Sequence, residues 1–419
     1  MSESGAGGAG DPFGGIPFFG DLAKMLSQSG PVNWETARQL AFSIATGGET
    51  EPNVDPMERI QLEQFSRIAE LHVGAITGLA TSTSGGLTIL PVTRSHWVNN
   101  AFKVYEPYFE AIAKALKPGS AQEPGTATSG SDPFGLANMQ AFSDPNTDPE
   151  AAMEAWFEQM MTMLAPVMLG MSAGSLIGHL STRSFGQYDL PIPQTAHDEL
   201  LLIWPNIKQF GEEWSLDPIE LRLWVCLHEI AHHTILSVPH VAKTLQQLLL
   251  EFVSAFEPDS SGLTNSLENI NPNDPTGLAS MQSMLSDPEV LLGAMRTSQQ
   301  DDLLARLDAI TTVIVGYVDW VMDEIGQRLM ASYGQITEAI RRRRVEASSQ
   351  DRFVGKILGL DLTQAHYERG SKFIAGVVER SGAAALSRLW EHPQNLPTPN
   401  EVAAPGLWLA RIDLPHDEA

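Results

Sequence analysis

The chain has 419 residues, of which 51 are acidic and 26 are basic, so its formal net charge is −25. A surface of this charge repels nucleic acid, and we expect no nucleic-acid partner. Cys226 is the only cysteine, which excludes a disulfide within the chain. The hydrophobic fraction of 43% is ordinary for a globular protein, and the chain is long enough to bury a large core.

The N-terminal segment, residues 1–30, is rich in glycine and predicts a flexible tail. It lacks the positive start and compact apolar segment of a secretory signal, which together with the lone cysteine favours a cytoplasmic location. Residues 31–419 are predicted to form a single domain. Two polar stretches crowded with proline, glycine and serine, at about 117–148 and 257–287, predict insertions outside its packed core.

Apolar residues recur at helical spacing through most of the first half of the chain. The predicted elements there are helices over 33–45, 55–79, 97–116 and 149–180, and a strand or extended link over 87–92. Alternation of Tyr188, Leu190 and Ile192 then predicts a strand or an extended segment over 184–193. Residues 195–210 are predicted to be helical again, with a break at Pro205.

Helical spacing also dominates the second half, so the predicted fold class is mainly α with minor β. The predicted elements are an amphipathic helix over 241–256, a long helix that begins at Ser298, further helix to about Trp390, and coil beyond it. The run Arg341-Arg342-Arg343-Arg344 is interpreted as a solvated helix end whose positive charge complements the helix dipole. A contact with an anion or a partner is the alternative.

Residues 159–182 contain no Asp, Glu, Lys or Arg and are the candidate for a membrane span. Their mixed polarity makes a poor bilayer segment, and we expect a packed core helix and no membrane association. Gly170, Gly174 and Gly178 recur every four residues, a spacing that permits close helix packing in membranes and in soluble cores alike.

The most specific motif is His228-Glu229-Ile230-Ala231-His232, which has the form H-E-x-x-H. Two histidines four residues apart project from one helical face and can bind one metal ion. Glu229 lies at the edge of that face, where it can act as the base toward a water activated by zinc. The motif therefore predicts a Zn²⁺ site with His228 and His232 as ligands and Glu229 as the catalytic residue.

The surroundings of the motif favour a buried helix. Asp217 is a good N-cap, Pro218 suits the first helical position, and Glu220 follows at the third. Buried imidazoles and carboxylates need partners, and a metal ion is one such partner. The alternative is a pair of core histidines hydrogen-bonded to the backbone or to carboxylates. His233 points away from the other two histidines and is expected to support the site from behind or to pack in the core.

A catalytic zinc site needs a third protein ligand, and Asp319 is the best candidate because large apolar residues surround it in the sequence. A salt bridge to an arginine, or a cap on another helix, would explain Asp319 equally well. Asp323, one turn later, could support the ligands or substitute for one. Tyr317 is a candidate for a supporting residue or for an oxyanion donor, with His366 and Tyr367 as other candidate donors.

The run Leu223-Trp224-Val225-Cys226 followed by the motif resembles the zincin-like metallopeptidase type 2 family of actinobacteria. Shorter blocks are similar as well, among them Gly186-Gln187-Tyr188-Asp189-Leu190-Pro191 and Leu358-Gly359-Leu360-Asp361-Leu362. The resemblance covers roughly residue 168 to the C-terminus. It implies a zincin-like helical metallohydrolase architecture, a zinc ion and hydrolase activity, and one branch of the family is associated with deazaflavin coenzyme biosynthesis.

The chain departs from that family at one informative position. Many members carry Glu-Gly where this chain has Val315-Gly316, and valine cannot bind a metal. The expected function is a zinc-dependent hydrolase, most specifically a metallopeptidase that acts on a peptide or a small molecule. The alternative is a non-catalytic helical scaffold or pseudoenzyme that retains the motif.

Overall fold

The computed structural model describes residues 30–116, 149–194, 198–258, 294–295, 298–346 and 355–414. At residues 149–164, 257–258, 294–295 and 298 it describes the backbone alone. The N-terminal tail and nearly all of the two predicted polar insertions lie outside these ranges. The division of the chain into a tail, one domain and two insertions therefore stays a prediction.

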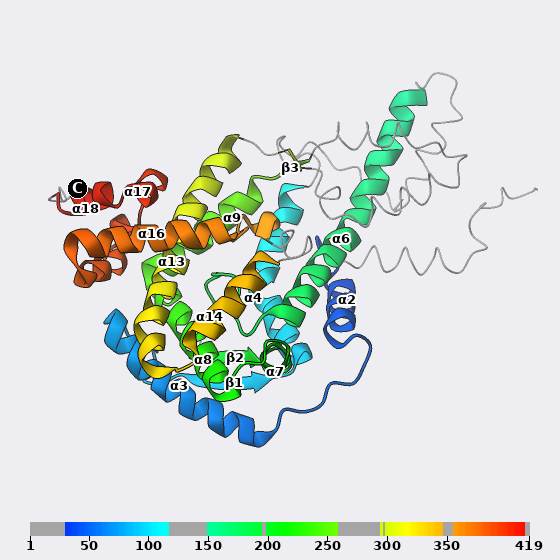
Figure 1. Cartoon of the computed structure of the whole chain (residues 1–419). Coiled ribbons are helices and arrows are strands. Elements are labelled where there is room, and N and C mark those ends of the chain that lie inside the picture. Colours follow the sequence, from blue (N-terminus) through cyan, green and yellow to red (C-terminus); the bar gives the residue numbers. More distant parts are fainter. Residues whose placement is uncertain are drawn as a thin grey trace, which may run out of the picture.

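Helices make up most of the described chain, which confirms the mainly α fold class (Figure 1). Most begin and end within a few residues of the predicted bounds. The α-helices are α2 (Trp34–Thr46), α3 (Pro56–Thr77), α4 (Arg94–Ala115), α6 (Pro149–Arg183), α7 (Trp204–Glu213), α8 (Pro218–Leu236), α9 (Pro239–Ser254), α13 (Ser298–Leu329), α14 (Tyr333–Val345), α16 (Gln364–Ser381), α17 (Pro399–Ala403) and α18 (Pro405–Ile412). Two 3₁₀-helices, η1 (Ala383–Trp390) and η2 (Pro393–Asn395), lie in the segment predicted as helix and then coil.

Strands are few and short. β1 (Thr88–Val92) pairs in parallel with β2 (Glu199–Ile203), with Leu90 opposite Leu201. β3 (Glu257–Pro258) pairs antiparallel with β4 (Ala294–Met295). The β1–β2 pair lies near α3, α7 and α8 at one end of the molecule in Figure 1.

Two secondary-structure predictions around this sheet are wrong. Residues 184–193 form an irregular segment instead of a strand, because the backbone amides of Gln187 and Tyr188 bind a side chain and not a neighbouring strand. Residues 199–203 are a strand instead of the first turns of a helix, and the helix α7 begins where Pro205 occupies its first turn. The apolar run of β2 is buried beside β1, whose pairing spans more than a hundred residues of sequence and leaves no local signal.

The glycine repeat of α6 is a helix-crossing surface. A Cβ atom at Gly170 or Gly174 would overlap the carbonyl oxygens of Asn33 and Ala37 on α2, and one at Gly178 would lie 2.8 Å from the Cβ of Ile44. Only glycine allows the two helix backbones to approach this closely. None of the helices in the described part of the chain is both long and apolar enough to cross a membrane.

A second glycine crossing fixes α13, which forms one side of the candidate site. A Cβ atom at Gly316 would overlap the backbone of Gly370 on α16, and one at Gly370 would overlap the carbonyl oxygen of Thr312. Because neither backbone can rotate or slide without a clash, the residue that precedes Gly316 is held in one orientation.

We predict that Gly174→Ala lowers the free energy of unfolding by about 1–3 kcal/mol, because the added methyl group forces α2 and α6 apart. Gly334→Ala is the matched control, since a Cβ atom there meets nothing within 4 Å. Alanine also favours helix over glycine, so the control should be neutral or stabilising. Equal unfolding midpoints for the two variants in a urea titration would contradict the crossing.

Candidate metal and catalytic site

The site is built on α8, whose start follows the predicted signals. The Asp217 carboxylate accepts hydrogen bonds from the backbone amides of Ile219 and Glu220, each at 2.9 Å. Glu220 does not complete a capping box; its carboxylate instead accepts hydrogen bonds from the backbone amides of Ala331 and Ser332. This contact joins the start of α8 to the turn between α13 and α14. Helix α8 also packs against α3 and α13 and is buried along most of its length.

His228 and His232 line one cavity of about 100 Å³. Their ring centroids lie 4.4 Å apart, as expected for two side chains on successive turns of one helical face. The Nδ1 atom of His232 lies 3.0 Å from the carbonyl oxygen of His228. A proton on Nδ1 would make this a hydrogen bond and leave Nε2 as the ligand atom, which is a common arrangement for zinc-binding histidines.

Aromatic rings hold both imidazoles in place. The Trp224 ring stacks on His228 at a centroid distance of 5.0 Å, and the Tyr188 ring is nearly parallel to His232 at 6.1 Å. The hydroxyl of Tyr188 lies 2.9 Å from Nδ1 of buried His233. His233 therefore contacts the ring that packs on His232. Tyr188 itself was predicted only as a strand residue.

Glu229 is 1% exposed and is held by the irregular segment that precedes β2. Its Oε2 atom accepts hydrogen bonds from the backbone amides of Gln187 (2.8 Å) and Tyr188 (3.1 Å). A Cβ atom at Gly186 would overlap the Glu229 carboxylate, so this approach requires glycine. The indole of Trp97 on α4 donates a hydrogen bond to the carbonyl oxygen of Gly186 at 2.8 Å, which ties the segment to the core.

Burial sets the ionisation of these groups. Burial, and after it the nearby guanidinium of Arg344, lowers the pKa of His228 to about 4. Burial also lowers the pKa of His232 to about 3. Both imidazoles are thus neutral at physiological pH, which is the form that binds a metal ion. Burial raises the pKa of Glu229 to about 7, against the opposing effects of His232 and the two backbone amides. A carboxyl group with this pKa suits proton transfer near neutrality.

Asp319 does not join the imidazoles as a ligand. Both of its carboxylate oxygens accept hydrogen bonds from Arg344, at 3.1 and 3.2 Å, which is the salt bridge considered as the alternative. Among the described residues, no three His, Cys, Asp or Glu side chains form a group that could hold a metal ion. The predicted third ligand is therefore corrected: an arginine from α14 neutralises Asp319.

The other candidates on α13 and α16 also have separate partners. Asp323 accepts a hydrogen bond from the hydroxyl of Tyr333 at 2.7 Å, and burial raises its pKa. Tyr317 packs edge-on against Trp390, with ring centroids 5.1 Å apart, and is a core residue. Nε2 of His366 lies 2.7 Å from a carboxylate oxygen of Asp308. Of the predicted oxyanion donors, Tyr367 alone lines the imidazole cavity.

Val315 is the α13 residue that lines the imidazole cavity. It lines the same cavity as His228 and His232, and although it is 2% exposed it does not belong to the main apolar core cluster. The Gly316–Gly370 crossing holds α13 in this orientation. The donor set thus fits zinc at two protein positions, through paired neutral imidazoles. Val315, the α13 side chain that lines the same cavity, cannot bind the metal.

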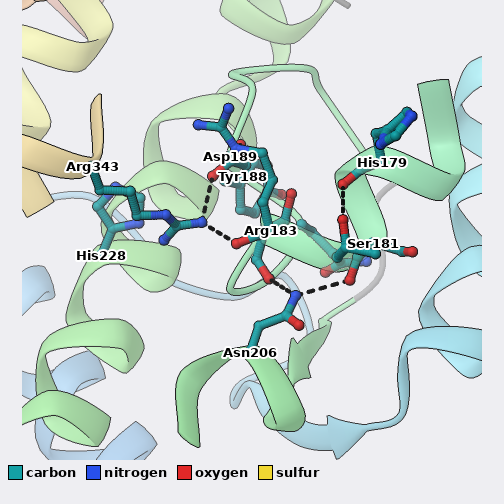
Figure 2. Close-up of polar contacts among 12 residues, drawn as sticks. His179, Ser181, Arg183, Tyr188, Asp189, Asn206, His228 and Arg343 are labelled. Atoms are coloured by element: carbon teal, nitrogen blue, oxygen red, sulfur yellow. Dashed lines mark hydrogen bonds and ion pairs between the residues drawn. The ribbon is translucent and has the colours of Figure 1, made fainter. Parts of the chain in front are cut away.

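Several site residues were not predicted as such from the sequence. Figure 2 shows the Arg343 side chain reaching toward Asp189 and the backbone of Arg183, in the region of His228. Asp189 also forms an ion pair with Arg183 at 3.6 Å. The family resemblance of the block from Gly186 to Asp189 is the one sequence signal that points to its role in the site.

We predict that Gly186→Ala destabilises the chain by about 1–3 kcal/mol, because the new methyl group overlaps the Glu229 carboxylate. The same substitution in a Glu229→Ala background should cost at least about 1 kcal/mol less, because the carboxylate is gone. Urea unfolding of the four proteins in this cycle measures the coupling. Gly86→Ala, where a Cβ atom meets nothing within 4 Å, is the control. An identical cost in both backgrounds would contradict the contact.

Comparison with known proteins identifies the family of the chain. The model of the zincin-like metallopeptidase family matches residues 32–409. A crystal structure from Chloroflexus aurantiacus, a provisionally assigned hydrolase with a novel fold, superposes with a TM-score of 0.60 at 23% identity, covering 92% of this chain and 100% of that one. No curated protein matches the chain significantly. Because the family model spans nearly all of the chain, this protein belongs to the zincin-like metallopeptidase family.

Proposed function

We propose that the protein is a zinc-dependent hydrolase that cleaves peptide bonds, with His228 and His232 as metal ligands and Glu229 as the general base. The observation that carries the proposal is that both imidazoles line one cavity, held by stacked aromatic rings, while the carboxylate between them is fixed by two backbone amides. Family membership supports the same reaction class.

Zinc, when bound, supplies a Lewis acid that acidifies water and polarises a carbonyl group. The chain's own groups have separable roles. Oε2 of Glu229 is occupied by the amides of Gln187 and Tyr188, so Oε1, which lies 3.4 Å from Nδ1 of His228, is the atom that accepts a proton from the attacking water. The same atom then delivers that proton to the leaving amine. Trp224 and Tyr188 exclude water from the imidazole rings by stacking on them.

A second candidate function is a pseudoenzyme that keeps the motif helix without catalysis. The specific observations in its favour are the Arg344–Asp319 salt bridge and the exposure of Val315 to the cavity at the position opposite the imidazoles. Zinc bound through two imidazoles alone would be held weakly, and hydrolysis would be correspondingly slow. The two candidates make different predictions for metal content and activity.

Zinc binding and catalysis can be measured separately. We expect the purified protein to bind one zinc ion per chain, and His228→Ala or His232→Ala to abolish binding. Glu229→Gln should retain the metal but lose at least about a hundredfold in hydrolysis of a mixed peptide substrate, because the base is missing. Elemental analysis and a fluorogenic peptide assay measure the two properties. Zinc-loaded protein without measurable hydrolysis favours the pseudoenzyme, and absence of zinc binding contradicts the metal site.

Substitution of Val315 tests whether this position can supply a metal ligand. We expect Val315→Glu to raise zinc affinity at least about tenfold, or about 1.4 kcal/mol, because a third ligand faces the two imidazoles. Val315→Gln is the matched control of nearly equal volume and without charge. Competition with a chelating dye gives the affinities. Equal zinc affinities for the Glu and Gln variants would show that position 315 does not reach the metal.

A further inference from the structure

The run of four arginines at the end of α14 divides into two chemically different pairs. The side chains of Arg341 and Arg342 are 56% and 59% exposed and bind Glu338 on the same helix. Those of Arg343 and Arg344 are only 19% and 18% exposed. The interpretation of the run as a solvated helix end therefore holds for the first pair and is wrong for the second. Two largely buried guanidinium groups call for another explanation.

Arg344 is fixed in a single orientation. Its guanidinium carbon lies 3.7 Å from the centroid of the Tyr367 ring, and its two terminal nitrogens bind the carboxylate of Asp319. A bidentate pair of this kind engages two of the five N–H donors of a guanidinium group, so a held arginine can still donate to a ligand. Asp319 and Tyr367 thus orient the cation in the manner of a preformed anion site.

Arg343 is also held by an aromatic ring and a carboxylate. Its guanidinium carbon lies 4.0 Å from the centroid of the Phe185 ring, and it reaches Asp189 and the backbone oxygen of Arg183 (Figure 2). Both arginines line the cavity that contains His228 and His232. A chain with a net charge of −25 thus gathers Arg183, Arg343 and Arg344 at the cavity of His228 and His232, together with Asp189 and Asp361.

Arg344 also stands between two cavities. A second cavity of about 380 Å³ lies between α13, α14 and α16, and it shares Trp224, Ile340, Arg344 and Tyr367 with the imidazole cavity. A ligand that extended from one cavity to the other would lie along these four shared residues, one of which is Arg344. This position is where a charged end or side chain of a substrate would be bound, next to a bond presented to the imidazoles.

We propose that Arg344, with Arg343 beside it, binds a carboxylate of the substrate, so that the peptide cleaved carries a free carboxylate close to the scissile bond. This inference rests on the proposed hydrolase function and names its substrate class. The carboxylate has two sources, the C-terminus of a peptide or the side chain of Asp or Glu. In both cases the fixed guanidinium groups select an acidic ligand and orient it in the cleft.

Calorimetric titration of the full-length, chelator-treated protein tests the inference, because removal of metal prevents a carboxylate from binding to zinc instead. The probes are N-acetyl-Ala-Ala, its C-terminal amide, and N-acetyl-Ala-Glu-amide. We expect at least one of the two carboxylate probes to bind at least about tenfold more tightly than the uncharged amide. Tighter binding of the first probe assigns the site to a C-terminus, and tighter binding of the third assigns it to an acidic side chain.

The variants separate binding from folding. Arg344→Gln should lower the affinity for the preferred carboxylate probe at least about tenfold and leave the affinity for the amide probe unchanged. Arg342→Gln, at an exposed neighbouring position, should change neither affinity. The double variant Asp319→Asn/Arg344→Gln removes both charges of the pair, so it retains the fold if loss of charge balance unfolds the single variant. It should bind the carboxylate as weakly as the single variant does.

Three results would overturn the inference. They are equal binding of acid and amide, no binding of either carboxylate probe, and undiminished carboxylate binding by the double variant. Zinc content and hydrolysis are not among these readouts, so failure of the hydrolase proposal is recognised separately. A protein that bound the carboxylate probes but no zinc would keep the anion site and lose the catalytic proposal.

Discussion

Burial of the Glu229 carboxylate on α8 is the constraint around which the site is arranged. A carboxylate that is 1% exposed requires hydrogen-bond donors, and the amides of Gln187 and Tyr188 supply them. To deliver those amides the chain must approach α8 at Gly186, where no side chain fits, and must give up strand pairing in this segment. The same segment carries Tyr188, which stacks on His232, so one loop serves both the base and a metal ligand.

Much of the helical framework was predictable, because its signals are local. Asp217 and Pro218 start α8 as expected, and Gly170, Gly174 and Gly178 mark a close helix crossing. The strand β2 was not predictable, because the run of leucines suits a buried helix as well as a strand and its partner β1 is distant in sequence. The error over 184–193 has a different origin: alternating side chains predicted a strand whose amides are engaged by Glu229.

The candidate site was predictable only in the part that lies on one helix. The spacing of His228 and His232 fixes their common face, and the structure keeps it. Their partners come from helices far away in sequence, and composition around a residue does not show which way it points. Asp319 has a cationic partner, as expected, but that partner is Arg344 and not a metal. The α13 residue that lines the imidazole cavity is Val315, one turn earlier than Asp319.

The central claim is that His228 and His232 bind one zinc ion. Anomalous diffraction at the zinc absorption edge, from crystals grown with equimolar zinc, tests this claim without a substrate. The account predicts one strong peak about 2.0–2.1 Å from the Nε2 atoms of both histidines. A zinc peak at another place would contradict it. So would imidazoles without metal in crystals grown with this amount of zinc.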